Sequence, residues 1–319
     1  MGIQGLLPFL KEIRREIHLS ELRGLRIAVD GYVWLHRAAF GCALELMQSH
    51  ETSKYVDFFM RQVYILKEHE IEPVIVFDGA PLPMKRSTEI ERRQRRDQQR
   101  AKGMQLLRAG KKLEAIECFQ RSVNITPVMA YHVIKALKHR EINFVVAPYE
   151  ADAQMAYLER TGYVDAVLSE DSDLLVFGVK RLITKLDRGG NAIEICGDNI
   201  MRVSALAAQS WNFSKFRQMC IMSGCDYLAS PHGIGLQKAA KFLENKRDAY
   251  QVIQSWINWG KAVKAPDLPP NYEESFRRAE WTFLHQRVFD PESRSLAYLT
   301  PLSLALTAEE ERGLDFLGP

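Results

Sequence analysis

The sequence predicts an α/β protein in which a mostly parallel central sheet is flanked by helices. Apolar stretches of strand length alternate with helix-favouring stretches, which is typical of βα units. Acidic residues directly follow three of these stretches, at Asp30, Asp78 and, after a short turn, Asp171. The carboxyl ends of parallel strands meet at one edge of a sheet, where open α/β sheets bind ligands. An acidic site is therefore expected at that edge.

The first two predicted strands, residues 22–29 and 73–77, each end in Asp-Gly. Predicted helices follow the first strand at residues 32–47 and 53–68. Asp-Gly is most often a simple turn, and that alternative holds for either pair taken alone. Its repetition at two strand ends favours a shared role for Asp30 and Asp78.

A third acidic group surrounds the predicted strands 144–147 and 163–168. Glu150 and Asp152 begin a helix that runs to about residue 160, where acidic side chains are favoured by the helix dipole. Asp171 and Asp173 follow the second strand, and Asp226 follows a predicted helix at residues 213–222. Helix capping and a solvated turn are the alternative explanations.

A metal site is the chemical interpretation of these carboxylates. Two unit charges about 4 Å apart repel by about 4 kcal/mol at an effective dielectric near 20, so a cation must lie among them. Oxygen ligands favour Mg²⁺ or Mn²⁺. An EF-hand starting at Asp171 is excluded because Val176 and Leu182 stand where Gly and Glu are required. The run Asp-Ser-Asp-Leu-Leu leaves a haloacid-dehalogenase-like phosphatase as a weaker alternative.

Residues 84–102 favour a helix yet are almost devoid of apolar side chains, so this helix cannot pack in a core along its length. Eight cations outnumber three acids in it, and Lys85, Arg92 and Arg96 share one face. A solvated charged helix is the common explanation of such a pattern. Proximity to Asp78 favours phosphate binding beside the metals.

The rest of the chain contains further predicted helices at residues 106–122 and 127–138 and a hairpin at residues 182–195. Gly233 and Gly235 precede a helix at residues 236–243 that carries Lys238 and Lys241. A helix N-terminus presents free N–H groups to anions. A second anion-binding element is therefore expected there, and residues 308–312 are expected in a surface tail.

Composition limits the class of protein. The 319 residues have a net charge of +3 and are 46% hydrophobic, as in ordinary globular proteins. Five cysteines form no Cys-x-x-Cys pair, which predicts reduced thiols and no disulfide. No apolar run approaches the ~20 residues of a membrane span, so no membrane association is expected.

Seven blocks in order make the sequence resemble the structure-specific 5′ nucleases of the flap endonuclease superfamily, and most closely its eukaryotic exonuclease 1 branch. The blocks include Met-Gly-Ile-Gln-Gly-Leu-Leu, Val-Phe-Asp-Gly and Ser-Gly-Cys-Asp-Tyr, and the resemblance extends to about residue 290. They lie at residues 1–7, 29–36, 76–79, 147–154, 169–175, 223–227 and 233–235.

The resemblance implies a PIN-like nuclease fold with a helical arch and a helix-two-turn-helix element that binds DNA. It implies two Mg²⁺ ions, with Mn²⁺ as a substitute, and catalytic roles for Lys85 and Arg92 at the scissile phosphate and for Asp173. The implied metal ligands are Asp30, Asp78, Glu150, Asp152, Asp171, Asp173 and Asp226.

The implied activity is Mg²⁺-dependent 5′ to 3′ hydrolysis of double-stranded DNA with 5′-flap cleavage, in repair, end resection and recombination. A dedicated flap endonuclease and a non-catalytic DNA-junction binder are the alternatives. The implied DNA contacts are Gly2, Tyr32, His36, Arg93, Arg96, Gly233, Gly235 and Lys238. A K⁺ ion at the helix-two-turn-helix would be held by Ser223, Ser230 and Ile234.

The same resemblance implies a monomer in the nucleus that binds duplexes with a 5′ end, nick, gap or 5′ flap. Mismatch-repair proteins would bind through a long tail, so a chain of 319 residues is expected to be a catalytic fragment or a tail-less form. We expect one compact catalytic domain with five regions: nuclease region with arch helix, arch connector, internal nuclease region, DNA-binding helices and tail. They span residues 1–105, 106–137, 138–226, 227–290 and 291–319.

Overall fold

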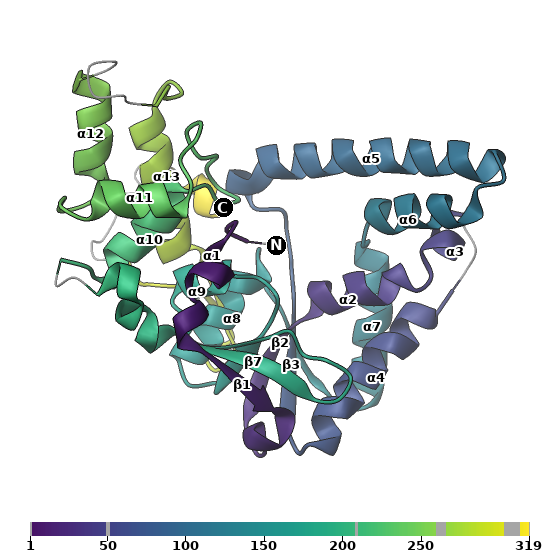
Figure 1. Ribbon diagram of the computed structural model, residues 1–319. Coiled ribbons are helices and arrows are strands. Elements are labelled where there is room, and N and C mark those ends of the chain that lie inside the picture. The colour runs from purple at the N-terminus through teal and green to yellow at the C-terminus, as the bar shows by residue number, and fades with distance from the viewer. Residues whose placement is uncertain (1, 49–51, 208–209, 260–265, 303–312, 319) are drawn as a thin grey trace.

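The computed structural model describes residues 2–48, 52–207, 210–259, 266–302 and 313–318. A seven-stranded sheet with the order β1-β7-β6-β5-β2-β3-β4 forms its centre (Figure 1). The five strands from β4 to β6 run parallel, which confirms the predicted fold class. The strands are β1 (Arg14–His18), β2 (Arg26–Asp30), β3 (Glu72–Phe77), β4 (Asn143–Val146), β5 (Ala166–Leu168), β6 (Arg181–Thr184) and β7 (Asn191–Cys196).

The strand order reverses between β2 and β5. From β2 the chain adds β3 and β4 on one side, and it then returns to add β5 and β6 on the other. Such a switch point opens a crevice at the carboxyl ends of the strands. Asp30 ends β2, and Asp171 follows β5 by a short turn, so both acids lie at this crevice.

Helices cover both faces of the sheet because the central strands are apolar on both sides. Ile27 and Val29 of β2 pack with helices α2 (Gly31–Phe40), α4 (Lys54–Glu68) and α7 (Pro127–His139). Ala28 between them faces the opposite core, formed with α8 (Ala151–Arg160), α10 (Phe213–Met222) and α13 (Tyr272–His285). The sheet therefore lies between two hydrophobic cores, with the crevice at its carboxyl edge.

Helix α5 (Arg86–Arg108) forms the arch and crosses the top of Figure 1 from the α10–α13 side to α6 (Lys112–Ser122) and α3 (Ala43–Met47). Its 23 residues correspond to roughly 35 Å. The predicted break near residue 103 is wrong. Gly103 lies inside the helix, at a close contact with α6 where an added Cβ would approach the Phe119 ring to 2.6 Å. The boundary expected between residues 105 and 106 lies within α5.

Other elements differ from the predicted ones in extent. The predicted helix 32–47 is two helices that meet at Gly41, the predicted strand 22–29 begins at residue 26, and the predicted strand 163–168 is confined to β5. Strand β1 and the hairpin of β8 (Arg287–Asp290) and β9 (Ser295–Tyr298) are not predicted. β1 reads Arg-Arg-Glu-Ile-His and lies at the sheet edge, where charge replaces apolar alternation.

Short helices and 3₁₀ turns connect the larger elements. The remaining α-helices are α1 (Leu6–Phe9), α9 (Asp173–Phe177), α11 (Leu236–Leu243) and α12 (Ala249–Trp259). The 3₁₀ turns are η1 (Lys11–Ile13), η2 (Leu19–Leu22), η3 (Pro83–Lys85), η4 (Gly197–Arg202), η5 (Ser204–Leu206) and η7 (Asp315–Leu317).

The region expected as a tail packs on the catalytic side of the molecule. Leu317 is fully buried, and Gly318 lies against the Tyr149 ring. The surface tail expected at residues 308–312 lies outside the described residues. Among the helices described, none is both long and apolar enough to cross a membrane. The five cysteines are free thiols.

Candidate metal centre and nucleic-acid interface

Asp30 is fixed at the end of β2 by two hydrogen bonds. Its Oδ1 accepts from the backbone N of Val33 at 3.0 Å, which caps α2, and its Oδ2 accepts from Ser169 Oγ at 3.0 Å. Burial, together with the negative charge of Asp171, raises the pKa of Asp30 to about 6. Asp30 is thus held rigidly where a cation would restore its charged form.

The turn after β5 holds two more carboxylates. Asp171 accepts a hydrogen bond from the backbone N of Asp173 at 3.0 Å, and Asp173 accepts one from the backbone N of Ile3 at 2.9 Å. Burial and neighbouring carboxylates raise the pKa of both residues. Gly2 lies so close that a Cβ there would approach Asp171 Oδ1 and Ser172 Oγ to 2.4 Å. The N-terminus therefore closes one side of the acidic site, and a side chain at residue 2 would clash there.

Asp78 and Asp152 face the same cluster from β3 and α8. Asp78 Oδ1 accepts from the backbone N of Ala151 at 2.7 Å. Loss of solvation and the charge of Asp30 raise the pKa of Asp78 to about 7, while the hydrogen bond from Ala151 and the charge of Lys85 act in the opposite direction. Burial and the charges of Asp171 and Asp30 raise the pKa of Asp152 well above its usual value. These shifts indicate excess negative charge in the crevice.

Glu150 faces a different set of partners from Asp152. Its Oε1 lies 2.5 Å from Lys85 Nζ, and its Oε2 accepts from Tyr227 Oη and from Gln286 Nε2. Residues two apart at a helix start point in different directions. Asp152 therefore joins the central cluster, while Glu150 contacts the base of the arch.

Two cations of the arch pair with the acidic site. Lys85 Nζ lies 2.9 Å from Asp226 Oδ2, and Arg92 Nη2 donates to both Asp226 oxygens at 2.8 Å. Burial alone would raise the pKa of Asp226, but Lys85 and Arg92 lower it. Burial likewise disfavours the Lys85 ammonium, yet Glu150 and Asp226 raise its pKa well above the usual value. The start of α5 is thus anchored electrostatically at the crevice.

The donor set fits hard divalent ions. All the clustered donors are carboxylate oxygens, and burial followed by the neighbouring carboxylates raises their pKa values. Within the described residues, no group of three or more His, Cys, Asp or Glu side chains forms a ready-made metal site. A divalent ion that retains several water ligands and binds through one or two carboxylates would suit this arrangement.

The underside of the arch faces α2. Burial, together with Arg96 and Arg92, lowers the pKa of His36. Tyr32, one turn earlier, is half-buried with its ring edge-to-face with Phe77. Arg93 and Arg96 line a cavity of about 640 Å³ beneath α5 with Met47 and Met129. The structure therefore collects these predicted DNA contacts under one helix.

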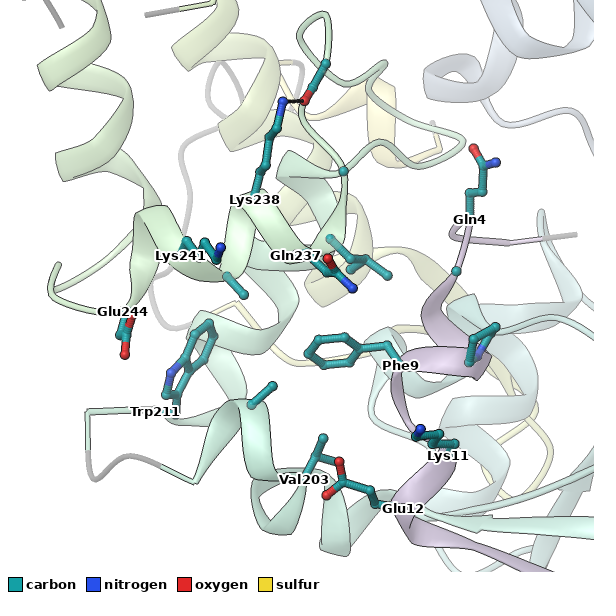
Figure 2. A pocket seen from close by; sticks show the side chains of 17 residues that line it. Gln4, Phe9, Lys11, Glu12, Val203, Trp211, Gln237, Lys238, Lys241 and Glu244 are labelled. Carbon is teal, nitrogen blue, oxygen red and sulfur yellow. Dashed lines mark hydrogen bonds between the residues drawn. The ribbon is translucent and has the colours of Figure 1, made fainter. Parts of the chain in front are cut away.

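The glycine turn lies away from the acids, beside α1. Gly233 has φ 75° and Gly235 caps α11 without a side chain, so the first backbone N–H groups of α11 have no side-chain cap. Lys238 Nζ donates to the Gly233 carbonyl at 2.7 Å (Figure 2). Figure 2 also shows Phe9 and Trp211 facing each other across the cavity of about 900 Å³ that this turn borders.

The residues expected at the monovalent ion adjoin this turn. Ser223 Oγ donates to the Cys220 carbonyl at 2.8 Å, and a Cβ on Gly224 would lie 3.1 Å from the Ser230 backbone N. Ile234 is buried. Ser230 thus lies against Gly224, the residue after Ser223, and the Ser223 hydroxyl keeps acceptor capacity.

Sequence reasoning missed three supporting residues. Ser169 donates to Asp30, and Tyr227 and Gln286 donate to Glu150. Tyr227 lies within a recognised block and Ser169 opens another, whereas no local pattern singles out Gln286. Its contact joins residues 136 positions apart.

Two family models match the chain, the XPG N-terminal domain over residues 1–99 and the XPG I-region over residues 141–226. The DNA damage-inducible protein DIN7 of Saccharomyces cerevisiae is 38% identical over 311 residues, covering 96% of this chain and 71% of that protein. The chain belongs to the XPG family. Exonuclease 1 of Xenopus laevis is 46% identical over 100% of the chain and 43% of its own length. Exonuclease 1 of Danio rerio is 47% identical over 94% and 37%.

The XPG chain thus spans less than half the length of these exonuclease 1 relatives. Solved structures share its fold. The catalytic core of Rad2 in complex with DNA substrate has a TM-score of 0.68 at 18% identity, covering 98% of this chain and 94% of that one. Flap endonuclease-1 from Methanococcus jannaschii has a TM-score of 0.58 at 22% identity, covering 85% and 86%. Membership of the XPG family over the whole chain replaces the dehalogenase-like alternative.

Proposed function

We propose that this chain is a divalent-metal-dependent 5′ to 3′ exodeoxyribonuclease on double-stranded DNA that also cuts 5′ flaps. One observation carries the proposal: carboxylates gather at the switch point of the sheet, and a basic helix is anchored on them through Asp226. This combination fits a phosphodiester that needs both metal ions and cationic side chains. The exonuclease activity is inferred from the similarity to exonuclease 1, and the 5′ to 3′ polarity from the resemblance of the sequence blocks to structure-specific 5′ nucleases.

The metal is Mg²⁺ in this proposal, with Mn²⁺ as its substitute. When bound, two such ions would supply a hydroxide nucleophile and stabilise the attacking and leaving oxygens. The carboxylates would hold both ions. Asp173 accepts from the backbone N of Ile3 at the N-terminal wall, and Glu150, which pairs with Lys85, would act through water or through Lys85. The proposed holders are Asp30, Asp78, Glu150, Asp152, Asp171, Asp173 and Asp226.

Lys85 and Arg92 would bind the scissile phosphate from the base of the arch. Both already lie at the acidic site, paired with Asp226. A phosphate oxygen can compete for these donors, and its developing charge would then be stabilised in a site with little solvent. Both residues therefore neutralise the carboxylates before substrate arrives.

The proposed DNA path has two parts. A single-stranded 5′ end lies under α5 against Tyr32, His36, Arg93 and Arg96, with Gly2 at the wall of the site. The duplex lies on the glycine turn, whose α11 N–H groups and Lys238 bind phosphates. A K⁺ ion at Ser223, Ser230 and Ile234 would join that turn to the duplex backbone.

The cellular role follows the same line of inference. We expect a nuclear monomer that processes nicks, gaps, recessed ends and 5′ flaps in repair, end resection and recombination. Mismatch-repair proteins are its proposed protein partners. The five regions predicted from the sequence would act as one catalytic domain. The first of them, which contains the arch helix, would extend to the end of α6 at Ser122.

The test uses a nicked duplex labelled separately at its 5′ and 3′ ends, with Mg²⁺ or with chelator. Metal-dependent release of short products from the 5′ end, abolished by Asp173→Ala, is the expected result. A preference for flaps with no attack on nicks would instead support a dedicated flap endonuclease. Tight binding without cleavage would support a non-catalytic junction binder.

A further inference from the structure

Gln286 approaches the acidic site from the far end of the chain. It follows α13, is fully buried, and donates from Nε2 to Glu150 Oε2 at 3.0 Å. Its backbone carbonyl accepts from the backbone N of Leu299 at 2.9 Å, so the residue is held by the segment that follows β9. Gln286 is therefore held by one hydrogen bond at its backbone and one at its side-chain amide.

The oxygen that Gln286 contacts receives a second donor. Tyr227 Oη also donates to Glu150 Oε2, and the Tyr227 ring packs edge-to-face with Phe283 of α13 at 4.9 Å. The other oxygen of Glu150 faces Lys85. Three donors from three elements thus set the direction of one buried carboxylate.

Gln154 is a second buried glutamine near the site, but its hydrogen bonds serve a different purpose from those of Gln286. Gln154 is also fully buried, but both ends of its amide bond the backbone of Phe289 at 2.7 Å, which ties α8 to β8. In the described part of the chain, Gln286 Oε1 has no hydrogen-bond partner. The Gln286 amide therefore contributes chiefly as a donor to Glu150, whereas Gln154 is a structural clamp.

We propose that Gln286 is a positioning residue of the nuclease centre, which with Tyr227 turns Glu150 toward Lys85. The inference rests on the proposed nuclease function. Without these two donors, Glu150 is free to rotate away from Lys85, and the ammonium loses the partner that holds it over the crevice. Outer partners of this kind typically change metal affinity or activity by roughly 10-fold to 100-fold.

The test compares Gln286→Met, Tyr227→Phe and the double variant with Gln154→Met as the matched control. Turnover and KM are measured on the nicked duplex, and Mn²⁺ binding is measured by calorimetry on the protein without DNA. We expect kcat or Mn²⁺ affinity to fall roughly 10-fold or more in both single variants, with KM for DNA little changed. The double variant should lose less than the product of the single losses, because both donors serve one oxygen.

Gln154→Met is expected to lower the melting temperature while turnover and Mn²⁺ affinity stay at wild-type values. The inference is overturned if Gln286→Met and Tyr227→Phe, folded by circular dichroism, match this control in both readouts. Tyr227→Phe removes only a hydroxyl group, so it answers the question even if Gln286→Met fails to fold. A wild-type protein that binds Mn²⁺ but cleaves no DNA would refute the nuclease proposal alone, and the Mn²⁺ comparison would still test the positioning role.

Discussion

Lys85→Ala should destabilise the metal-free protein more than any ordinary surface substitution on α5. Lys85 is the cation between Glu150 and Asp226, at 2.5 and 2.9 Å. The substitution removes that cation and leaves two mostly buried carboxylates facing each other. The expected effect is a lower free energy of unfolding in chelator.

The size of the effect follows from burial. The Lys85 side chain is 18% exposed and that of Glu150 is 8% exposed, so water cannot readily replace the lost partner. Removing one member of a buried pair costs about 3 to 5 kcal/mol. Arg92 still pairs with Asp226, so we expect the lower end, about 3 kcal/mol. At an unfolding entropy of about 2.1 cal/mol/K per residue, this corresponds to a fall of about 4 to 5 °C in Tm.

Thermal unfolding in chelator measures this difference, with Arg95→Ala on the adjoining helix α5 as the control. Arg95 pairs with Glu91 in the open, at 78% and 66% exposure, and such pairs contribute little. Equal melting temperatures for the two variants would refute the proposed anchoring of α5. In nuclease assays Lys85→Ala should lower kcat far more than DNA affinity, and the reverse would contradict its role at the phosphate.

Three further expectations concern other parts of the molecule. Lys238→Ala should weaken duplex binding and leave kcat nearly unchanged. The slope of log binding constant against log salt concentration, measured by fluorescence anisotropy, should become shallower by about 0.9. An unchanged slope would exclude a contact between Lys238 and a phosphate. The pKa of Asp30 is raised from 3.8 to about 6 in the folded protein, so protonation of Asp30 favours the folded state. This contribution to the free energy of unfolding is complete below about pH 4 and is lost as the pH rises to about 6. The gain in Tm on adding Mg²⁺ should therefore be larger near pH 8 than near pH 5, and a pH-independent gain would argue against this account. Gly103→Ala should lower the free energy of unfolding measured in urea, because the added Cβ would lie 2.6 Å from the Phe119 ring. Gly41→Ala is the control, since its nearest atom is 3.6 Å away. Helix propensity alone predicts that Gly103→Ala is more stable than the wild type, and that result would contradict the close packing of α5 on α6.

The sequence predicts the central sheet well because β2 and β3 are buried on both faces and end in Asp-Gly. It also predicts which acids lie at the crevice, since parallel strands bring Asp30, Asp78 and Asp171 to one edge. It does not predict β1, whose charged residues pair with β7 at an edge where no apolar alternation is needed. The partners of Glu150 also escape prediction, because they come from 77 and 136 positions away, beyond any local pattern.

The contact between Ile3 and Asp173 spans 170 positions. Together with the contact of Gln286, it means that the acidic site takes its walls from segments that lie more than 280 positions apart. Contacts of such long range form late, because the intervening chain must first be ordered. A chain still emerging from the ribosome therefore lacks a complete centre, and ribosome-bound chains arrested before residue 286 should be inert toward labelled duplex. The topology itself would delay the proposed DNA-cutting activity until residue 286 has been synthesised.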